Sequence, residues 1–274
     1  MTDSVTYAYA VARNTDGLEE SVAALTGVAG APVHLLAGTR GGEPVLVVSP
    51  VPAGDFQEEA LKRHFEDLGW LEAVARAHHA VIEALAERTT VLPMRLATVY
   101  LDDDRARGVL AADRDAFEDR LSHLAAHVEW GVKIYVDPPA ARAAAPAAAP
   151  GPDPATAGLS PGRAYLRTRK AQKSVRDDVY RVAQQAAERV EAVGRRHAAD
   201  RARHRVQQGE LATSPGENVV NDAYLVPRER AEDFRSEVSR AADGLEGVRV
   251  EVTGPWAPYS FAMPTAPSDD AAEA

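Results

Sequence analysis

The chain has 274 residues, 45% of them hydrophobic, which is enough to bury a sizeable core and is a soft prior for about two domains. Its lack of cysteine excludes disulfides, thiol nucleophiles and zinc sites built on thiolates. The formal net charge of −10 disfavours a general nucleic-acid binder, and no run approaches the ~20 apolar residues of a membrane-spanning helix.

The first residues, Met1 to Tyr7, lack the basic and apolar regions of a signal peptide, so we expect a cytoplasmic protein without a membrane segment. Alternating β-forming residues predict a strand over Val5 to Val11, and a short helix follows through Leu25. Two apolar runs, 33–36 and 45–48, flank a glycine-rich stretch and predict a β-hairpin. The glycine-rich stretch is not a phosphate-binding loop, because no Gly-Lys-Ser/Thr follows it.

The longest helical pattern runs from Phe56 to Leu85. Its apolar residues recur every three or four positions, which places them on one face of a core-facing helix. We expect this helix to break once, at Gly69, and to be capped by Asp55. The residues of the apolar face are Leu61, Phe65, Leu68, Leu71, Val74, His78, Val81 and Leu85.

Arg95 stands within an apolar and β-branched stretch, Val91 to Tyr100. Burying an unpaired guanidinium is costly, so Arg95 must either pair with a carboxylate or carbonyl inside the fold or be presented to a ligand. We favour the internal partner, because most partly buried arginines form structural pairs.

Three adjacent aspartates, Asp102 to Asp104, open the next helix, where the helix dipole favours acids. They could bind a metal, but adjacent residues on a helix point in different directions. A further helix, Phe117 to His127, carries His123 and His127 at the spacing of two metal ligands on one face. The glutamate of a His-Glu-x-x-His motif is missing, so we expect a surface histidine pair, no metal and no cofactor.

Residues 130–136 alternate cleanly and predict a strand, whereas residues 138–160 are almost all Ala, Pro and Gly and predict a flexible loop within one βα unit. A long helix follows, with Ser160 as its cap and Pro161 in its first turn. Residues 163–205 contain 13 Arg or Lys and 5 Asp or Glu, a charge of +8 that leaves −18 for the rest of the chain. We interpret this segment as a solvated helix face rather than an RNA contact, because aromatic stacking residues are missing from it.

After a weak strand candidate at 203–211, residues 219–226 predict a clearer strand. A helix over residues 227–242 and a strand over residues 248–253 follow. From Trp130 onward, the order strand, helix, strand, strand, helix, strand indicates a split-βαβ, ferredoxin-like arrangement.

The segment from Gly254 to Phe261 contains two prolines and three aromatic residues. We therefore expect it to leave the sheet and fold back over an apolar surface. The final residues, 263–274, predict a disordered acidic tail.

Six short motifs, in order along nearly the whole chain, resemble the gas vesicle protein F/L family (GvpF/GvpL). Each motif is weak alone, yet six in register make a chance match improbable. The Ala/Pro loop is longer and more biased than is usual in this family. The motifs are Glu66-Asp-Leu-Gly-Trp-Leu71 with Ala75-Arg-Ala-His78, Val91-Leu-Pro-Met-Arg-Leu-Ala-Thr-Val-Tyr100, Trp130-Gly-Val-Lys133, Gly162-Arg-Ala-Tyr-Leu166, Asn221-Asp-Ala-Tyr-Leu-Val-Pro227 and Gly254-Pro-Trp-Ala-Pro-Tyr-Ser-Phe261.

The resemblance implies an α+β protein with an N-terminal α+β domain over residues 1–128 and a modified ferredoxin-like domain over residues 129–262. It also implies a minor protein of gas vesicle assembly, located in the cytoplasm and at the vesicle. Its implied partners are the small hydrophobic shell subunit and other accessory gas vesicle proteins. The family has no established catalytic residues, and the motifs do not distinguish its F and L members.

Three functions remain open at the level of the sequence. The first is a non-enzymatic binding protein that limits aggregation of the shell subunit, with five partner-binding residues: Arg95, Trp130, Trp256, Tyr259 and Phe261. The second is a small-molecule- or metal-dependent enzyme on a ferredoxin-like scaffold, using His123, His127, Arg95 and Asp102 to Asp104. The third is nucleic-acid binding through Arg195, Arg196 and Arg201, which the net charge disfavours.

Overall fold

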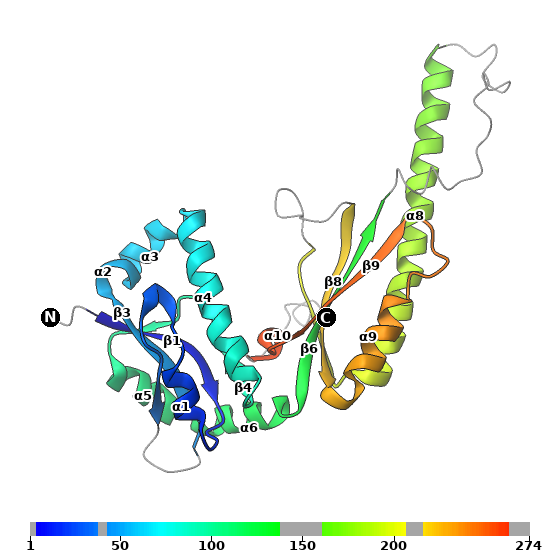
Figure 1. Ribbon diagram of the computed structural model, residues 1–274. Coiled ribbons are helices and arrows are strands. Elements are labelled where there is room, and N and C mark those ends of the chain that lie inside the picture. The colour runs from blue at the N-terminus through cyan, green and yellow to red at the C-terminus, as the bar shows by residue number, and fades with distance from the viewer. Residues whose placement is uncertain (1–3, 38–42, 138–160, 207–215, 263–274) are drawn as a thin grey trace, which may run out of the picture. The chain divides into compact units, whose positions relative to one another are not determined.

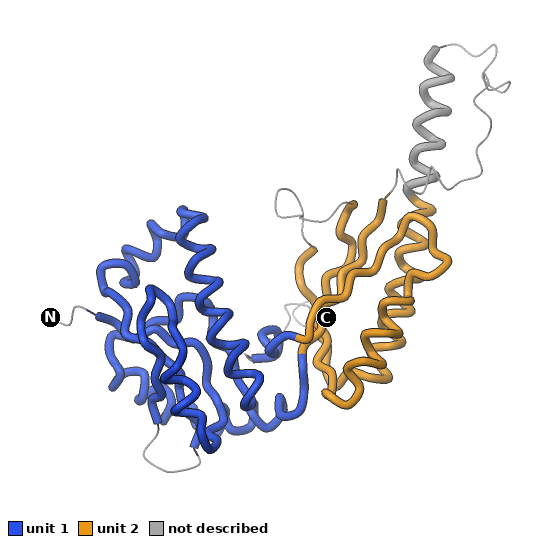
Figure 2. Tube along the Cα trace, in the orientation of Figure 1, with its two compact units in different colours: residues 1–128, 256–274 blue, residues 129–255 orange. Residues whose placement is uncertain are grey.

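The computed structural model describes residues 4–37, 43–137, 161–206 and 216–262, and it describes side chains in these ranges except at 161–176. The predicted Ala/Pro loop (138–160) and acidic tail (263–274) lie outside the described residues. Helices and antiparallel strands are mixed along the chain, which confirms the predicted α+β class (Figure 1). Contacts divide the chain into two compact units, which are coloured separately in Figure 2.

Unit 1 comprises residues 1–128 and 256–274, and unit 2 comprises residues 129–255. We expected a second domain that runs to residue 262. The contacts instead group Trp256 to Ala262 with unit 1, because Ala257 and Tyr259 join the hydrophobic core of that unit. The chain thus passes from unit 1 to unit 2 and returns.

Unit 1 is built on one antiparallel sheet with strand order β2-β3-β1-β4, in which β5 also pairs with β1. Pairing of β2 with β3 confirms the predicted hairpin, and β1 matches the first predicted strand. The strands are β1 (Ser4–Ala12), β2 (His34–Ala37), β3 (Val45–Pro52), β4 (Val91–Pro93) and β5 (Val99–Tyr100).

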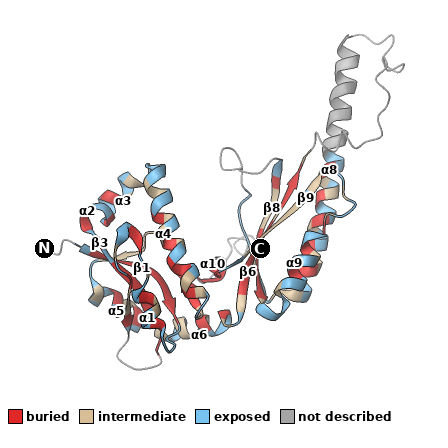
Figure 3. Ribbon diagram, in the orientation of Figure 1, coloured by how far each residue is buried: buried red, intermediate tan, exposed pale blue. Residues whose placement is uncertain are grey.

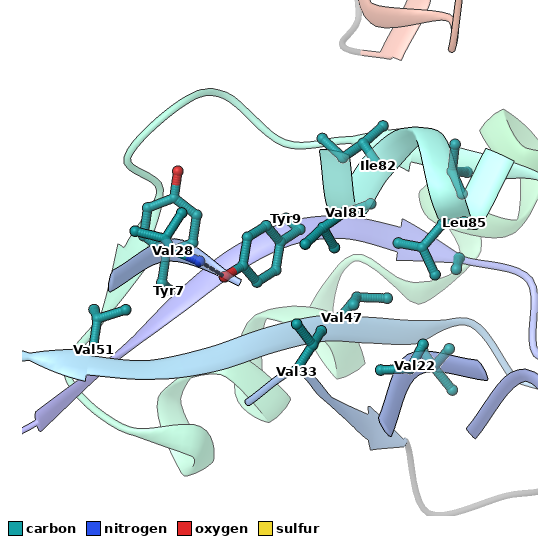
Figure 4. Close-up of a cluster of buried hydrophobic side chains, with 14 of the residues drawn as sticks. Tyr7, Tyr9, Val22, Val28, Val33, Val47, Val51, Val81, Ile82 and Leu85 are labelled. Carbon is teal, nitrogen blue, oxygen red and sulfur yellow. Dashed lines mark hydrogen bonds between the residues drawn. The ribbon is translucent and has the colours of Figure 1, made fainter. Parts of the chain in front are cut away.

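Helix α4 (Leu68–Ala86) supplies the main helical contribution to the core of unit 1. Its buried residues Val81, Ile82 and Leu85 pack with Tyr7 and Tyr9 of β1 (Figure 4). Figure 3 shows the buried residues on the strands and on the inner faces of the helices. The other helices of unit 1 are α1 (Leu18–Ala23), η1 (Val28–Gly30), α2 (Ala53–Phe56), α3 (Glu58–His64), α5 (Asp103–Ala112), α6 (Arg114–Leu124) and α10 (Tyr259–Ala262).

The predicted long helix is divided between α3 and α4, and its one break lies at residues 65–67, just before Gly69 rather than at it. The predicted cap is wrong, because Asp55 lies within α2 and Gln57 precedes α3. The Asp67 carboxylate accepts hydrogen bonds from the backbone N–H groups of Gly69 (3.0 Å) and Trp70 (3.1 Å) and so begins α4. This new start changes the phase of the apolar face. Phe65 and Leu68, which we predicted to face the core, are 47% and 78% exposed.

A buried hydrogen-bond chain links β1 to η1 and β3. The Val28 N–H donates to the Tyr9 hydroxyl (2.8 Å), which donates to Ser49 Oγ (2.9 Å); Figure 4 marks the first of these bonds. Ser49 in turn donates to the Pro32 carbonyl (2.8 Å). These bonds give partners to the Val28 N–H and to the Tyr9 and Ser49 hydroxyls, which the core encloses.

Unit 2 has a four-stranded sheet with strand order β7-β8-β6-β9. The strands are β6 (His127–Val136), β7 (Asp200–Arg203), β8 (Glu217–Pro227) and β9 (Val248–Trp256). The helices are α8 (Pro161–His197), η3 (Arg228–Arg230) and α9 (Ala231–Ser239). Helix α8 contacts α9 and β8, and its buried residues are Val179, Ala183, Ala186, Val190 and Val193.

Two predicted boundaries in this part of the chain are wrong. The helix predicted to reach His127 ends at Leu124, and His127 begins β6. The last strand was predicted to end at Thr253, but β9 continues through Gly254 and Pro255, which are joined by a cis peptide bond. A Cβ on Gly254 would lie 2.8 Å from the Glu129 carbonyl oxygen, so the missing side chain lets β9 stay close to β6.

Among the residues that the structure describes, no helix has both the length and the apolar composition needed to cross a bilayer.

Candidate partner-binding surface

The structure places the five predicted partner-binding residues in different environments. Trp256 is 39% exposed at the end of β9, Arg95 is exposed after β4, and Tyr259 is half-buried in α10. Trp130 and Phe261 are each only 5% exposed. In this conformation the last two side chains belong to the core and are not available to a partner.

Trp256 and Tyr259 lie against His79 of α4, and we call these three residues the C-terminal aromatic cluster. The His79 ring centroid is 5.8 Å from that of Trp256 and 5.9 Å from that of Tyr259. His79 Nδ1 is 3.0 Å from the Tyr259 hydroxyl, and Nε2 is 3.0 Å from Oε1 of Glu83. These contacts fix the Trp256 ring on the surface of unit 1.

The predicted folding back of the C-terminal segment over an apolar surface agrees with these contacts. Ala257 is buried in the unit 1 core, and Tyr259 packs against that core. The sequence did not identify His79 as the partner of the segment, because 180 residues separate it from Tyr259.

Beneath the cluster, Tyr7 and His78 form a buried polar pair. The Tyr7 hydroxyl lies 3.0 Å from His78 Nδ1 and accepts a hydrogen bond from the Ala97 N–H (3.1 Å). Burial raises the pKa of Tyr7 well above its ordinary value and lowers the pKa of His78 to about 4. Both groups are therefore neutral near pH 7, as a structural pair in a packed core requires.

The prediction of an internal partner for Arg95 is wrong. The residue is exposed, and within the described residues its guanidinium has no ion pair or hydrogen bond. The reason is local: β4 ends at Pro93, and the chain turns where the Thr98 N–H and hydroxyl both donate to the Arg95 carbonyl. Arg95 thus leaves the apolar strand and is free to reach a partner.

The polar residues of the enzyme hypothesis do not form one constellation, since each has its own neighbour. His123 and His127 stack with centroids 6.3 Å apart, but His127 Nδ1 lies 2.8 Å from the Ala125 carbonyl. The Asp102 carboxylate caps α5 by accepting from the Arg105 N–H (2.8 Å). Among the described residues, no group of three or more His, Asp or Glu could hold a metal ion.

The other two aspartates also have separate partners. Asp103 accepts a hydrogen bond from Thr6 Oγ1 (2.7 Å), and Asp104 pairs with Arg107 (3.1 Å). These bonds tie the start of α5 to β1 and to its own next turn, which is a structural role.

Acidic residues of unit 2 neutralise much of the basic charge at the end of α8. Arg201 pairs with Asp222 (2.6 Å) and Glu191 (2.8 Å). Arg196 pairs with Glu237, and Arg195 lies 3.8 Å from Glu191. These pairs use the three arginines on which the nucleic-acid hypothesis depended, which favours the structural interpretation of this charge.

A second surface, which the sequence reasoning missed, is a groove of about 550 Å³ in unit 1 between β5 and α5. Its exposed rim includes Leu101, which is 68% exposed. The sequence contains one signal for this groove, because Gly108 lies inside the continuous helix α5, where a better helix former would be expected. The groove is lined by Val99, Tyr100, Leu101, Asp104, Arg105, Gly108, Val109, Ala112 and Asp113.

Comparison with known proteins adds the family context. The family model described as "Gas vesicle synthesis protein GvpL/GvpF" matches residues 5–263. The chain is 44% identical to gas vesicle protein L of Streptomyces sp. (strain CB03234), over 95% of this chain and 94% of that protein. It is 28% identical to gas vesicle protein F of the same strain, over 72% of this chain and 80% of that protein.

Two solved structures have a similar fold. The crystal structure of GvpF from Anabaena sp. PCC7120 matches with a TM-score of 0.63 at 18% identity, covering 96% of this chain and 98% of that one. The crystal structure of GvpF from Microcystis aeruginosa matches with a TM-score of 0.61 at 18% identity, covering 94% of this chain and 99% of that one.

Proposed function

This chain belongs to the gas vesicle synthesis protein GvpL/GvpF family, and from this membership we propose that it is a non-enzymatic accessory protein of gas vesicle assembly. In this proposal it binds the hydrophobic shell subunit and other gas vesicle proteins, limits their aggregation, and acts in the cytoplasm and at the growing vesicle. Its place in gas vesicle formation rests on the family. Its mode of action rests on the surface of unit 1.

The observation that carries the binding role is the exposed Trp256 ring, which packs on His79, itself 3.0 Å from the Tyr259 hydroxyl. A tryptophan that is already fixed at a surface loses little freedom when a partner covers it, which is typical of residues that contribute strongly to binding. A subunit that forms a gas-filled wall must expose apolar surface before assembly, and such surface aggregates unless a partner covers it. Trp256 offers a rigid apolar contact of that kind.

Of the five residues first predicted to bind partners, we propose direct contact for Trp256 and Arg95, with Tyr259 as the residue that orients Trp256. Arg95 is exposed and has no partner among the described residues, so it can meet a carboxylate or carbonyl of the bound protein. Trp130 and Phe261 are assigned to the core, given their burial.

We further propose that the chain is an L member of the family. Its identity to the L protein of one Streptomyces strain is 44%, against 28% for the F protein of the same strain, and the match to L spans more of the chain.

For unit 2 we propose a modified ferredoxin-like fold. In chain order its elements are β6, α8, β7, β8, α9 and β9, and its strands lie in the order β7-β8-β6-β9. That order places the first strand and the third side by side at the centre of the sheet, as in the split-βαβ arrangement.

The binding role can be tested by co-purification of the tagged full chain with the shell subunit. Trp256→Ser should reduce the recovered shell subunit at least fivefold, because it removes the exposed ring. Phe65→Ser is the matched control: it also removes an exposed aromatic side chain of unit 1, but in α3–α4, and should leave recovery unchanged. Equal recovery with Trp256→Ser and with the unaltered chain would contradict the proposal, as would normal vesicles in a strain that lacks the gene.

A further inference from the structure

The groove between β5 and α5 is separate from the C-terminal aromatic cluster, because the two share no residue. We propose that it docks an amphipathic helix of another gas vesicle protein, with apolar side chains in the groove and a lysine or arginine beside Asp113. This inference rests on the proposed function in one respect only, which is that the partner is a gas vesicle protein. The groove itself is defined by residues of unit 1 alone.

Helix α5 buries one face in the core, and the face that lines the groove carries small and apolar residues between charged ones. Ala106 and Leu110 are buried inside unit 1. Gly108, Val109 and Ala112 line the groove on another face of the same helix. A helix with such residues on a face outside the core is expected where that face receives a partner.

The opposite wall of the groove is also apolar. It is formed by Val99 and Tyr100 of β5 and by the largely exposed Leu101. Leucine at this exposure contributes nothing to the core of unit 1. Covered by apolar side chains of a partner, it would add to the buried apolar area of the complex.

The packing of unit 1 gives no reason for a glycine at position 108. A Cβ at this position would meet no atom within 4 Å, so the fold of unit 1 does not require glycine there. Glycine in a helix interior is less favourable than alanine. Its presence is explained if the floor of the groove must allow close approach of another helix, because the side chains at the contact set the distance between helix axes.

Opposite charges at the two ends of the groove determine the direction in which a partner helix would bind. Arg105 and Asp113 are eight residues apart on α5, which is roughly 12 Å at the rise of an α-helix. Within the described part of the chain, neither side chain has an ion pair or a hydrogen bond. A partner with a basic residue at the Asp113 end and an acidic residue at the Arg105 end would satisfy both.

The charge of unit 1 also favours a basic partner. Residues 1–128 and 256–274 contain 11 Lys or Arg and 23 Asp or Glu, a net charge of −12. Complementary charge speeds encounter and excludes acidic competitors. Two or three apolar side chains spaced three and four apart on a helix match the length of the groove.

The docked segment can be identified by crosslinking, since the chain has no cysteine of its own. Ala112→Cys in the full chain places a single thiol in the groove, where a benzophenone reagent is attached. Ala111→Cys is the matched control, because it is equally exposed on α5 but lies outside the groove. The labelled chains are irradiated with the purified shell subunit and, separately, with each purified accessory protein of the same gene cluster.

We expect at least fivefold more crosslinked product from Ala112→Cys than from Ala111→Cys, with one of these partners. The crosslinked peptide should belong to a helix with a Leu, Ile or Val repeat and an adjacent Lys or Arg. Equal products from the two positions, a crosslink only to a second copy of this chain, or a crosslink to an acidic or non-helical segment would each overturn the inference.

Affinity measurements on the crosslinked partner provide the second test. Gly108→Leu fills the groove and should weaken binding about tenfold or more, and Gly108→Ala, which adds one methyl group at the contact, should weaken it about threefold. Asp113→Lys, an exposed change that does not affect the core, should also weaken binding and should reduce its salt dependence. Unchanged affinity in both Gly108→Leu and Asp113→Lys would overturn the inference.

Failure of this inference can be told apart from failure of the proposed function. Binding that is lost in Trp256→Ser but kept in Gly108→Leu and Asp113→Lys would leave the accessory role intact and remove the groove from it. If neither the shell subunit nor any accessory protein binds the unaltered chain, both ideas fail.

Discussion

At the level of single residues, the hydroxyl of Tyr9 shows how unit 1 tolerates polar atoms in its core. It accepts from the Val28 N–H and donates to Ser49 Oγ, so each of these groups has a partner. The hydroxyl of Tyr224 in unit 2 is equally buried, but it has no hydrogen-bond partner among the described residues. The two tyrosines are similarly buried, but only the Tyr9 hydroxyl contributes hydrogen bonds to the stability of its unit.

This contrast gives a matched pair of variants. Tyr9→Phe should lower the free energy of unfolding by about 2 kcal/mol, because it leaves a buried N–H without an acceptor. Tyr224→Phe should change stability by less than about 0.5 kcal/mol or increase it, because no hydrogen bond is lost. Urea denaturation of both variants at pH 7 measures the difference, and equal losses would show that the two hydroxyls do not differ in this way.

His78 makes the stability of unit 1 depend on pH. Its pKa is about 4 in the folded protein, below the ordinary value near 6.5, because it is buried. Between these two values the unfolded chain binds a proton that the folded chain does not, so stability falls as the pH falls. From pH 7 to pH 5 this group should cost about 2 kcal/mol of unfolding free energy.

His78→Gln removes the titration, so its stability should fall about 2 kcal/mol less than that of the unaltered chain over the same pH range. His123→Gln is the matched histidine-to-glutamine control, because its ring is exposed and lies outside the core of unit 1. Parallel profiles for the unaltered chain and His78→Gln would mean that the buried ring is protonated as readily as a free one.

At the level of secondary-structure elements, Arg201 joins three of them. From β7 it donates to the Asp222 carboxylate of β8 through Nε (3.1 Å) and an Nη (2.6 Å), and to Glu191 of α8 (2.8 Å). Asp222 is only 4% exposed, so without Arg201 its carboxylate would be buried away from its ion-pair partner. The bond holds the edge strand β7 against the rest of unit 2.

Arg201→Gln should therefore destabilise unit 2 by about 3 kcal/mol at pH 7, because it leaves a buried carboxylate unpaired. Arg195→Gln serves as the control: its side chain is 70% exposed, and its loss should cost less than about 1 kcal/mol. Urea denaturation of the two variants at pH 7 measures these effects, and equal losses for Arg201→Gln and Arg195→Gln would show that the buried carboxylate does not depend on Arg201.

The elements that the sequence predicted well are those with a strong period. Alternating β-forming residues located β1 and β6, and the apolar period of three to four located α4. The predictions failed where a single local contact determines which residues face the core. Phe65 and Leu68 fit the helical period as well as the true core residues do, and only the capping of α4 by Asp67 turns them outward.

The candidate surfaces were harder to predict than the elements. Two prolines and three aromatics correctly indicated that the C-terminal segment folds back, but its contact with His79 depends on tertiary packing. Burial of Trp130 and Phe261 could not be read from residue type, since aromatic residues serve cores and interfaces alike. The turn that exposes Arg95 depends on hydrogen bonds of Thr98 that no spacing rule reports.

At the level of the whole molecule, the two units have separate cores, and unit 1 carries most of the negative charge. Separate cores are expected to open independently. Hydrogen exchange should therefore show that Tyr9→Phe increases exchange in β1 and β3 only, and that Arg201→Gln increases it in β7 and β8 only. If either variant increases exchange equally in both units, the units unfold as one.

The return of the chain to unit 1 has a consequence during synthesis. Ala257 and Tyr259, which complete the core of unit 1, leave the ribosome after all of unit 2. At typical rates of translation, on the order of ten seconds separate residue 128 from residue 257. Unit 1, most of which is made first, is thus finished only after unit 2, and the surface that carries Trp256 forms only once unit 2 has been synthesised.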